Sequence, residues 1–204
     1  MNMARTDPKG GDTPPGGETA RAPDTVLTAG DLRLRPWRET DDSALCTACQ
    51  DLEVGRWVSI PQPFSLEDAR EQIAAWASMW QEGTGAPFAV VEAASDRLLG
   101  AVVLVGPDGH QATLGCWVVG EARGRGVGRR VLRRVARWAF ETTEVVRIDA
   151  YIMVGNEASE RMTSRAGFQR EGVLRSWDLL RGEPVDCVVY SLLRGDQPVT
   201  EGLD

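Results

Sequence analysis

Residues 121–134 read EARGRGVGRRVLRR, where three glycines alternate with larger residues just before a basic helix that we expect over residues 127–142. The N-terminus of a helix presents unpaired N–H groups and the positive end of the helix dipole, so it attracts anions. Glycines before such a helix let the backbone approach phosphate oxygens without a Cβ in the way. Gly124, Gly126 and Gly128 therefore predict a site for a polyphosphate ligand.

Three arginines beside these glycines, Arg123, Arg125 and Arg129, can add charge-assisted hydrogen bonds to an anion. The pattern is not a Rossmann fingerprint, because Arg129 occupies the position of its third glycine. It is not a phosphate loop either, because the only lysine, Lys9, is far from the turn. The same lack of lysine excludes a Schiff-base mechanism for the part expected to fold.

The apolar spacing on either side of the turn predicts helices and strands. Upstream, a strand ends at Pro36, and Thr40 or Asp41 can cap a helix that runs to about Leu52. A second helix follows the capping-box pattern SLED at residues 65–68. Three antiparallel strands, the helix of the glycine turn, a central strand, a short helix and a closing hairpin come next. The expected strands cover residues 88–94, 97–106, 112–120, 145–152, 172–180 and 186–193.

The composition favours one domain between two tails. The chain has 204 residues, is 42% hydrophobic and carries a formal net charge of −7. Residues 1–27 are rich in Gly, Pro, Thr and Asp, which predicts a disordered tail before a folded domain at 28–195 and a short tail at 196–204. No apolar run is long enough for a membrane span or a signal peptide, so we expect a cytoplasmic protein with no membrane partner.

The cysteines and the single histidine do not form a metal or triad pattern. Cys46 and Cys49 belong to a helical pattern without a second Cys or His pair, so they and Cys116 and Cys187 are expected to be free thiols rather than metal ligands. His110 lies in the turn sequence GPDGHQ, which favours an exposed turn residue over a Ser/His/Asp triad. We therefore expect no metal.

The basic side chains of the helix after the turn raise the alternative of RNA binding. Val127, Val131, Val135 and Trp138 mark its buried stripe, which leaves the arginines on the solvated face. The acidic net charge also argues against nucleic acid as a partner. These arginines are Arg129, Arg130, Arg133, Arg134 and Arg137.

Two linked stretches, GCWVVGEARGRGVGRRVLRRVARWAF at 115–140 and NEASERMTSRAGFQREGVLR at 156–175, resemble the GCN5-related N-acetyltransferases (GNAT). Within that family the likeness is greatest to the RimJ/RimL-like branch, which acetylates ribosomal-protein N-termini. The resemblance covers residues 30–194. It implies an α+β GNAT fold, in which a mixed, mostly antiparallel seven-stranded sheet splays after the fourth strand and about four helices flank it. Acetyl-CoA or another acyl-CoA then lies in the gap.

The family pattern Arg/Gln-x-x-Gly-x-Gly/Ala falls on Arg123, Gly126 and Gly128. In the family, pantetheine pairs with the strand before this turn, and the pyrophosphate rests on the amides of the turn. Asn156 matches a residue that reaches pantetheine, and Ser159 matches one near the thiolate. The residues that the resemblance assigns to acyl-CoA are Trp117, Val118, Val119, Arg123, Gly124, Arg125, Gly126, Val127, Gly128, Arg129, Asn156 and Ser159.

The sequence departs from the wider family at two catalytic positions. Thr163 stands where many members have a tyrosine acid, so Ser159 is the better candidate to protonate the leaving thiolate, with Tyr190 as another. Thr113 stands where many have a glutamate, which leaves the general base open. Glu121, Asp149 and Glu53 are the candidates, with water relaying the proton. Without the family resemblance, Asn156 would be interpreted as a helix cap and Ser159 as a surface residue of a helix.

The resulting prediction is a metal-free N-acyltransferase that moves an acetyl or other short acyl group to a primary amine. A strand N–H near Val118 would stabilise the oxyanion. The amine could be a protein or peptide N-terminus or a small molecule, and the protein a monomer or homodimer. The alternative is a non-catalytic acyl-CoA or peptide binding module on the same fold. Residues expected around the amine are Trp57, Glu53, Asp149 and Tyr190.

Overall fold

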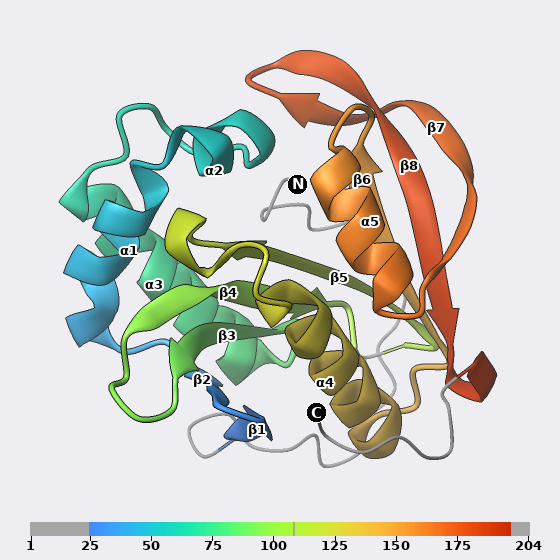
Figure 1. Ribbon diagram of the computed structural model, residues 1–204, viewed down its shortest axis with the longest axis horizontal. Helices are drawn as coiled ribbons and strands as arrows, with labels where there is room; N and C mark the ends of the chain where they lie inside the picture. Colours follow the sequence, from blue (N-terminus) through green and yellow to red (C-terminus); the bar gives the residue numbers. More distant parts are fainter. Residues whose placement is uncertain (1–24, 108, 197–204) are drawn as a thin grey trace.

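A sheet of eight strands, in the order β1-β2-β3-β4-β5-β6-β8-β7, runs through the molecule (Figure 1). The computed structural model describes residues 25–107 and 109–196. Every neighbouring pair in the sheet is antiparallel except β5 and β6, which are parallel. The strands are β1 Leu27–Ala29, β2 Leu32–Pro36, β3 Gly85–Glu92, β4 Leu98–Val105, β5 Gln111–Val118, β6 Arg147–Met153, β7 Gln169–Leu180 and β8 Glu183–Leu193.

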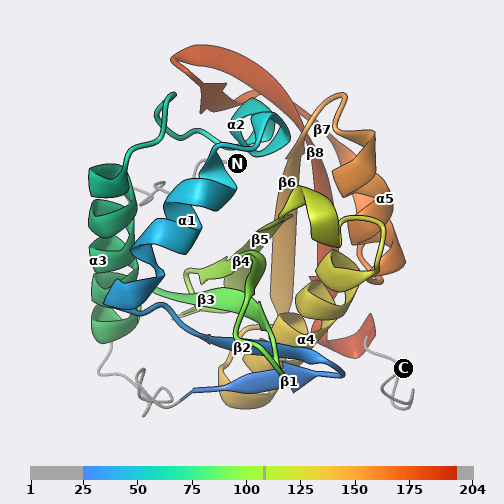
Figure 2. The ribbon, with the colours of Figure 1, turned by 60° about the vertical axis from the view of Figure 1, so that its left-hand side comes forward.

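Helices cover both faces of the sheet (Figure 2). One face packs against the first three helices and the other against the last two, so each face has its own apolar core. Trp76 and Leu45 are buried on the first side, and Val131 and Val135 on the second. The α-helices are α1 Asp42–Cys49, α2 Leu52–Trp57, α3 Leu66–Glu82, α4 Val127–Thr142 and α5 Glu157–Arg165; short 3-10 turns cover Glu39–Asp41, Gly120–Ala122 and Arg194–Asp196.

The sheet splays open between its two parallel strands. The register of β5 with β6 extends only from Gln111–Arg147 to Thr113–Asp149, and beyond that point the two strands diverge (Figure 1). β6 instead pairs with β8 from Arg147 to Met153. The expected α+β GNAT fold is confirmed. The sheet has eight strands rather than seven, because Leu27–Ala29 adds an edge strand, and the splay therefore follows the fifth strand.

The segment before α3 differs from the prediction. One helix was expected to reach Leu52, but α1 ends at Cys49 and a separate helix, α2, begins at Leu52. The physical reason is a new cap: the side chain of Asp51 accepts a hydrogen bond from the backbone N–H of Glu53 at 2.9 Å. The chain thus has three α-helices between β2 and β3, where two were expected.

Asp41 stands at the N-cap of α1, but its side chain does not cap that helix, because its carboxylate binds Arg35 and the Arg38 N–H instead. The remaining predicted helix ends are confirmed. Ser65 and Asp68 form the capping box of α3, and Gly83 ends that helix at φ +69°. The helix of the glycine turn spans residues 127–142 as expected. Asn156 caps α5 by accepting the Ser159 N–H at 3.1 Å.

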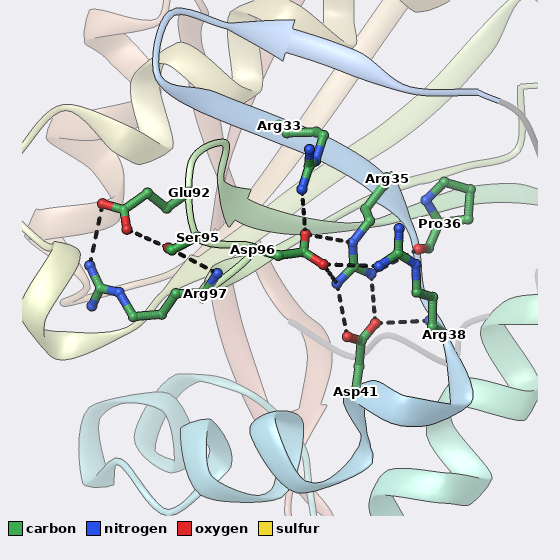
Figure 3. A network of polar contacts seen from close by, with 9 residues as sticks. All are labelled: Arg33, Arg35, Pro36, Arg38, Asp41, Glu92, Ser95, Asp96 and Arg97. Atoms are coloured by element: carbon green, nitrogen blue, oxygen red, sulfur yellow. Dashed lines mark hydrogen bonds and ion pairs between the residues drawn. The ribbon is translucent and has the colours of Figure 1, made fainter.

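A cluster of charged residues fixes β2 to the start of α1 (Figure 3). Arg35, only 3% exposed, donates to both oxygens of Asp41, at 2.7 and 2.9 Å. Asp96, between β3 and β4, accepts from Arg33 at 2.8 Å and Arg38 at 2.9 Å. Burial acts to raise the pKa of Asp96, but Arg35 and Arg33 outweigh it and lower the pKa to about 2.

The predicted tails lie mostly outside the described residues, which exclude 1–24 and 197–204. β1 begins at Leu27, whose side chain is 4% exposed, so the packed chain begins one residue before the expected boundary. His110 is exposed, as expected. The four cysteines are free thiols. Across the described ranges, no helix has the length and apolarity to cross a membrane, and no group of acidic, His or Cys side chains could hold a metal ion.

Candidate active site

A cavity of about 810 Å³ opens where β5 and β6 diverge. Its walls come from α2, β5, the glycine turn with α4, β6 and α5. The lining includes many of the residues predicted for the site: Glu53, Trp57, Trp117, Val118, Arg123, Gly124, Gly126, Val127, Gly128, Arg129, Asn156 and Ser159. Five predicted residues do not line it: Val119, Glu121, Arg125, Asp149 and Tyr190.

The glycine turn has the geometry of an anion cradle. Gly124 and Gly126 adopt φ values of +74° and +73°, which residues with a Cβ rarely adopt. Gly126 is also the N-cap of α4. A Cβ at either position would meet no atom within 4 Å, so the space beside the backbone is open. The N-terminus of α4 thus faces the cavity without side chains in the way, which fits a phosphate-bearing ligand.

Gly128 has a different role. A Cβ there would clash with the sulfur of Met162, so the glycine permits the close approach of α4 and α5. Thr163, beside Met162 on α5, is 2% exposed and also lines the cavity.

The edge of β5 offers backbone hydrogen-bonding groups to the gap. Val119 donates its N–H to Leu99 of β4 at 2.9 Å, so the N–H and C=O of Val118 point away from β4 and toward the divergence. Val118 C=O accepts a hydrogen bond from Arg123 Nε at 3.0 Å. The predicted backbone site near Val118 is therefore exposed to the cavity.

The arginines of the turn are not equivalent. Arg123 lines the cavity, but its Nη2 lies 2.6 Å from Asp51 Oδ2, so its guanidinium binds protein groups. Arg129 lines the cavity, and Arg125 is exposed outside it.

Of the three predicted bases, only Glu53 lines the cavity. Its carboxylate accepts a hydrogen bond from Trp57 Nε1 at 3.3 Å and lies 3.6 Å from Arg56 Nη1. Glu121 is exposed and pairs with Arg97.

Asp149 is 1% exposed and lies at the last registered pair of β5 and β6. Its carboxylate is 2.7 Å from Arg147 and accepts from Gln111 across the two strands. These contacts fix the junction from which the strands diverge.

Tyr190 is also placed away from the cavity. It is 5% exposed, and its hydroxyl donates to Glu160 at 3.1 Å. Burial and the neighbouring carboxylate raise its pKa.

Tyr151 of β6 lines the cavity, although the sequence analysis did not select it. Its ring lies 4.9 Å from that of Trp177 on β7. Burial, with Asp149 as a lesser cause, raises the pKa of Tyr151 to about 12, so it keeps its proton at neutral pH. The sequence did offer one signal for Tyr151. Side chains alternate along a strand, so Tyr151 shares a face of β6 with Asp149, which the sequence analysis had selected.

Cys116 also lines the cavity and was not selected for the site. Burial raises the pKa of its thiol to about 12, which keeps it in the unreactive protonated form.

The family profile described as "Acetyltransferase (GNAT) domain" matches residues 31–169. The "Uncharacterized N-acetyltransferase YoaA" of Bacillus subtilis is 28% identical over 171 residues, which cover 83% of this chain and 97% of that protein. The "Putative ribosomal N-acetyltransferase YdaF" of the same organism is 30% identical over 167 residues, with 80% and 90% covered.

Among solved structures, Mycobacterium smegmatis RimJ, in complex with CoA-disulfide, superposes with a TM-score of 0.78. Its sequence identity is 20%, and the match covers 86% of this chain and 90% of that one, so it shows the shared fold. The profile match, the relatives and the splayed sheet agree with one another. The chain therefore belongs to the GNAT family and is an N-acetyltransferase of that family.

Proposed function

We propose that the protein transfers an acetyl or other short acyl group from acyl-CoA to the primary amine of a protein or peptide N-terminus. The observation that carries this proposal is the cavity at the divergence of β5 and β6, where the glycine turn and the N-terminus of α4 meet the exposed edge of β5. RimJ, which shares the fold, is solved with CoA-disulfide, and this supports an acyl-CoA donor here.

The donor would lie along the cavity. The amides of residues 124–129 would hold its pyrophosphate, because they combine open backbone with the dipole of α4. The backbone of Val118 would pair with pantetheine, and Asn156 would add a contact from α5. These groups orient the thioester and raise its effective concentration beside the amine.

The chemistry is direct transfer. The neutral amine attacks the thioester carbonyl, the oxyanion is stabilised by a backbone N–H near Val118, and the C–S bond breaks. The amine loses a proton and the departing thiolate gains one. We assign proton donation to the hydroxyl of Ser159, because it lines the cavity on the first turn of α5. Tyr151 of β6, which also lines the cavity, is a second candidate donor.

One carboxylate, Glu53, is the candidate to accept the proton of the amine, directly or through water. It lines the cavity beside Trp57. The test replaces Glu53 by glutamine. If Glu53 is the base, Glu53→Gln should lower kcat/KM at pH 7 and lose the acidic limb of the wild-type pH–rate profile.

An amine acceptor suits the α2 side of the cavity. Glu53 brings negative charge, and Trp57 and Tyr151 bring aromatic faces that attract an ammonium group. The name of the B. subtilis relative YdaF points to ribosomal N-acetylation, which supports a protein N-terminus as the acceptor.

The test is thiol release from acetyl-CoA with a panel of amines: pentapeptides with free N-terminal serine, alanine or methionine, the same peptides with blocked N-termini, and spermidine. Turnover with free but not blocked peptides is expected, with mass spectrometry placing the acetyl group on the N-terminal nitrogen. Turnover with spermidine alone would replace the peptide class by small amines. No turnover with any amine would refute the proposed function.

A further inference from the structure

α2 is a short helix that carries three cavity-lining residues. These are Glu53, Val54 and Trp57. Val54 is 2% exposed, whereas Leu52 is 83% exposed. Six residues of helix are marginal by themselves, because the helical hydrogen bonds are few. Contacts at the ends of α2 must therefore contribute to its position.

The N-terminal end is tied to the glycine turn through Asp51. One oxygen of this carboxylate accepts the Glu53 N–H at 2.9 Å and caps α2. The other oxygen lies 2.6 Å from Nη2 of Arg123, and Nε of the same arginine donates to Val118 C=O at 3.0 Å. A single carboxylate thus connects α2 to the end of β5.

The C-terminal end is tied to the hairpin of β7 and β8. The tip of this hairpin lies beside α2 in both views (Figures 1 and 2). Arg181 at the tip donates from Nη2 to the C=O of Gly55. That carbonyl belongs to the last turn of α2, where carbonyls lack helical partners and positive charge is favoured. Arg181 and Gly182, at φ +54° and +86°, form the two-residue turn that presents the guanidinium.

We propose that Asp51 and Arg181 are positioning residues that hold α2 at its two ends and so place Glu53 and Trp57 for the acceptor amine. This inference rests on the proposed function. Neither residue needs to touch the substrate, and neither lines the cavity. Glu53 lies between the two anchored positions, and Trp57 lies two residues beyond Gly55 in the last turn of α2. Loss of either anchor therefore allows α2 to shift and weakens acceptor binding.

Two variants test the anchors separately. Asp51→Asn removes the charge opposite Arg123 but keeps the cap, because Asn and Asp cap helices about equally well. Arg181→Met removes the donor to Gly55 and keeps an unbranched side chain. Arg181→Lys retains a cationic donor and should restore the contact. Exposed residues outside the cavity serve as matched controls, in Glu144→Gln and Arg175→Met.

The assay uses acetyl-CoA with the panel amine that the wild type acetylates fastest. Asp51→Asn and Arg181→Met should each raise the acceptor KM by about three- to tenfold, the usual net effect of losing one intramolecular hydrogen bond, with kcat within about twofold. Arg181→Met should leave the dissociation constant of acetyl-CoA within about twofold. Arg181→Lys and both controls should match the wild type. Amide hydrogen exchange at residues 53–58 should be faster in the two anchor variants.

The inference would be overturned if the wild type is active and both anchor variants have the same acceptor KM as the wild type. It would also be overturned by an Arg181→Met variant that weakens acetyl-CoA binding as much as acceptor binding, because that pattern indicates general damage to the site. Absence of wild-type turnover with every panel amine is a different result, and it would refute the proposed function itself.

Discussion

Replacement of Gly126 by aspartate should weaken acyl-CoA binding far more than it weakens the fold. The residue lies at φ +73° as the N-cap of α4, and a Cβ there would meet no atom within 4 Å. The new side chain therefore causes backbone strain but no clash. A non-glycine residue in this conformation costs about 1 kcal/mol, which corresponds to a fall in melting temperature of about 2–4 °C in a domain of this size.

The larger effect is electrostatic. At about 5 Å in water, one carboxylate repels the roughly two charges of a pyrophosphate by about 1.7 kcal/mol, and more where water is excluded. Each 1.4 kcal/mol is about tenfold, so the dissociation constant of acetyl-CoA should rise by at least about tenfold. Gly126→Asn, which has the same size and tolerates the same backbone, isolates the charge. Gly83→Asp places the same strain, at φ +69°, at the end of α3.

Isothermal titration with acetyl-CoA and thermal unfolding measure the two effects separately. Gly126→Asp should bind at least about tenfold more weakly than Gly126→Asn, and the difference should shrink as salt is added, because salt screens exposed charges. Gly83→Asp should bind acetyl-CoA as the wild type does. A folded Gly126→Asp variant with wild-type affinity would refute the placement of the pyrophosphate on this turn.

Three further perturbations test other parts of the structure. Ser159→Ala should lower kcat by roughly ten- to a hundredfold at saturating substrates with little change in the KM of acetyl-CoA, and a full kcat would exclude its hydroxyl as the proton donor. Gly128→Val should lower the free energy of unfolding by about 1–3 kcal/mol in a denaturant titration, because its Cβ meets Met162, and unchanged stability would contradict that contact. Asp96→Asn should lower the melting temperature at pH 7 by about 2–4 °C. Folding lowers the pKa of Asp96 to about 2, so its contribution to stability is full above the unfolded pKa near 4 and is lost as pH falls through about 2. The difference in melting temperature between Asp96→Asn and the wild type should therefore shrink over that pH range. A difference that stays constant would contradict the assignment.

Local signals in the sequence predicted the elements that position the donor site. The bounds of α4 follow from apolar spacing after the glycines, and the Asn156 cap follows from the preference of its side chain for the first backbone N–H groups of a helix. These signals act within one or two helical turns. Edge strand β1 was missed because three residues carry too little periodicity to indicate a strand.

The acceptor side depends on contacts between distant residues, which local patterns do not encode. Asp51 meets Arg123 and Arg181 meets Gly55 only after the sheet and the hairpin have formed. Asp149 could be recognised as an acid in a buried strand, but its engagement with Gln111 required the register of β5 and β6. Sequence alone therefore left three possible bases, and the fold leaves one of them lining the cavity.

A crystal structure of the protein with CoA tests the central claim most directly. The account predicts the pyrophosphate within hydrogen-bond distance of the backbone amides of residues 124–129, and the pantetheine between β5 and β6 beside Val118. The thiol should then lie near Ser159. Density for CoA on another surface, with the space between β5 and β6 filled by side chains, would contradict the account.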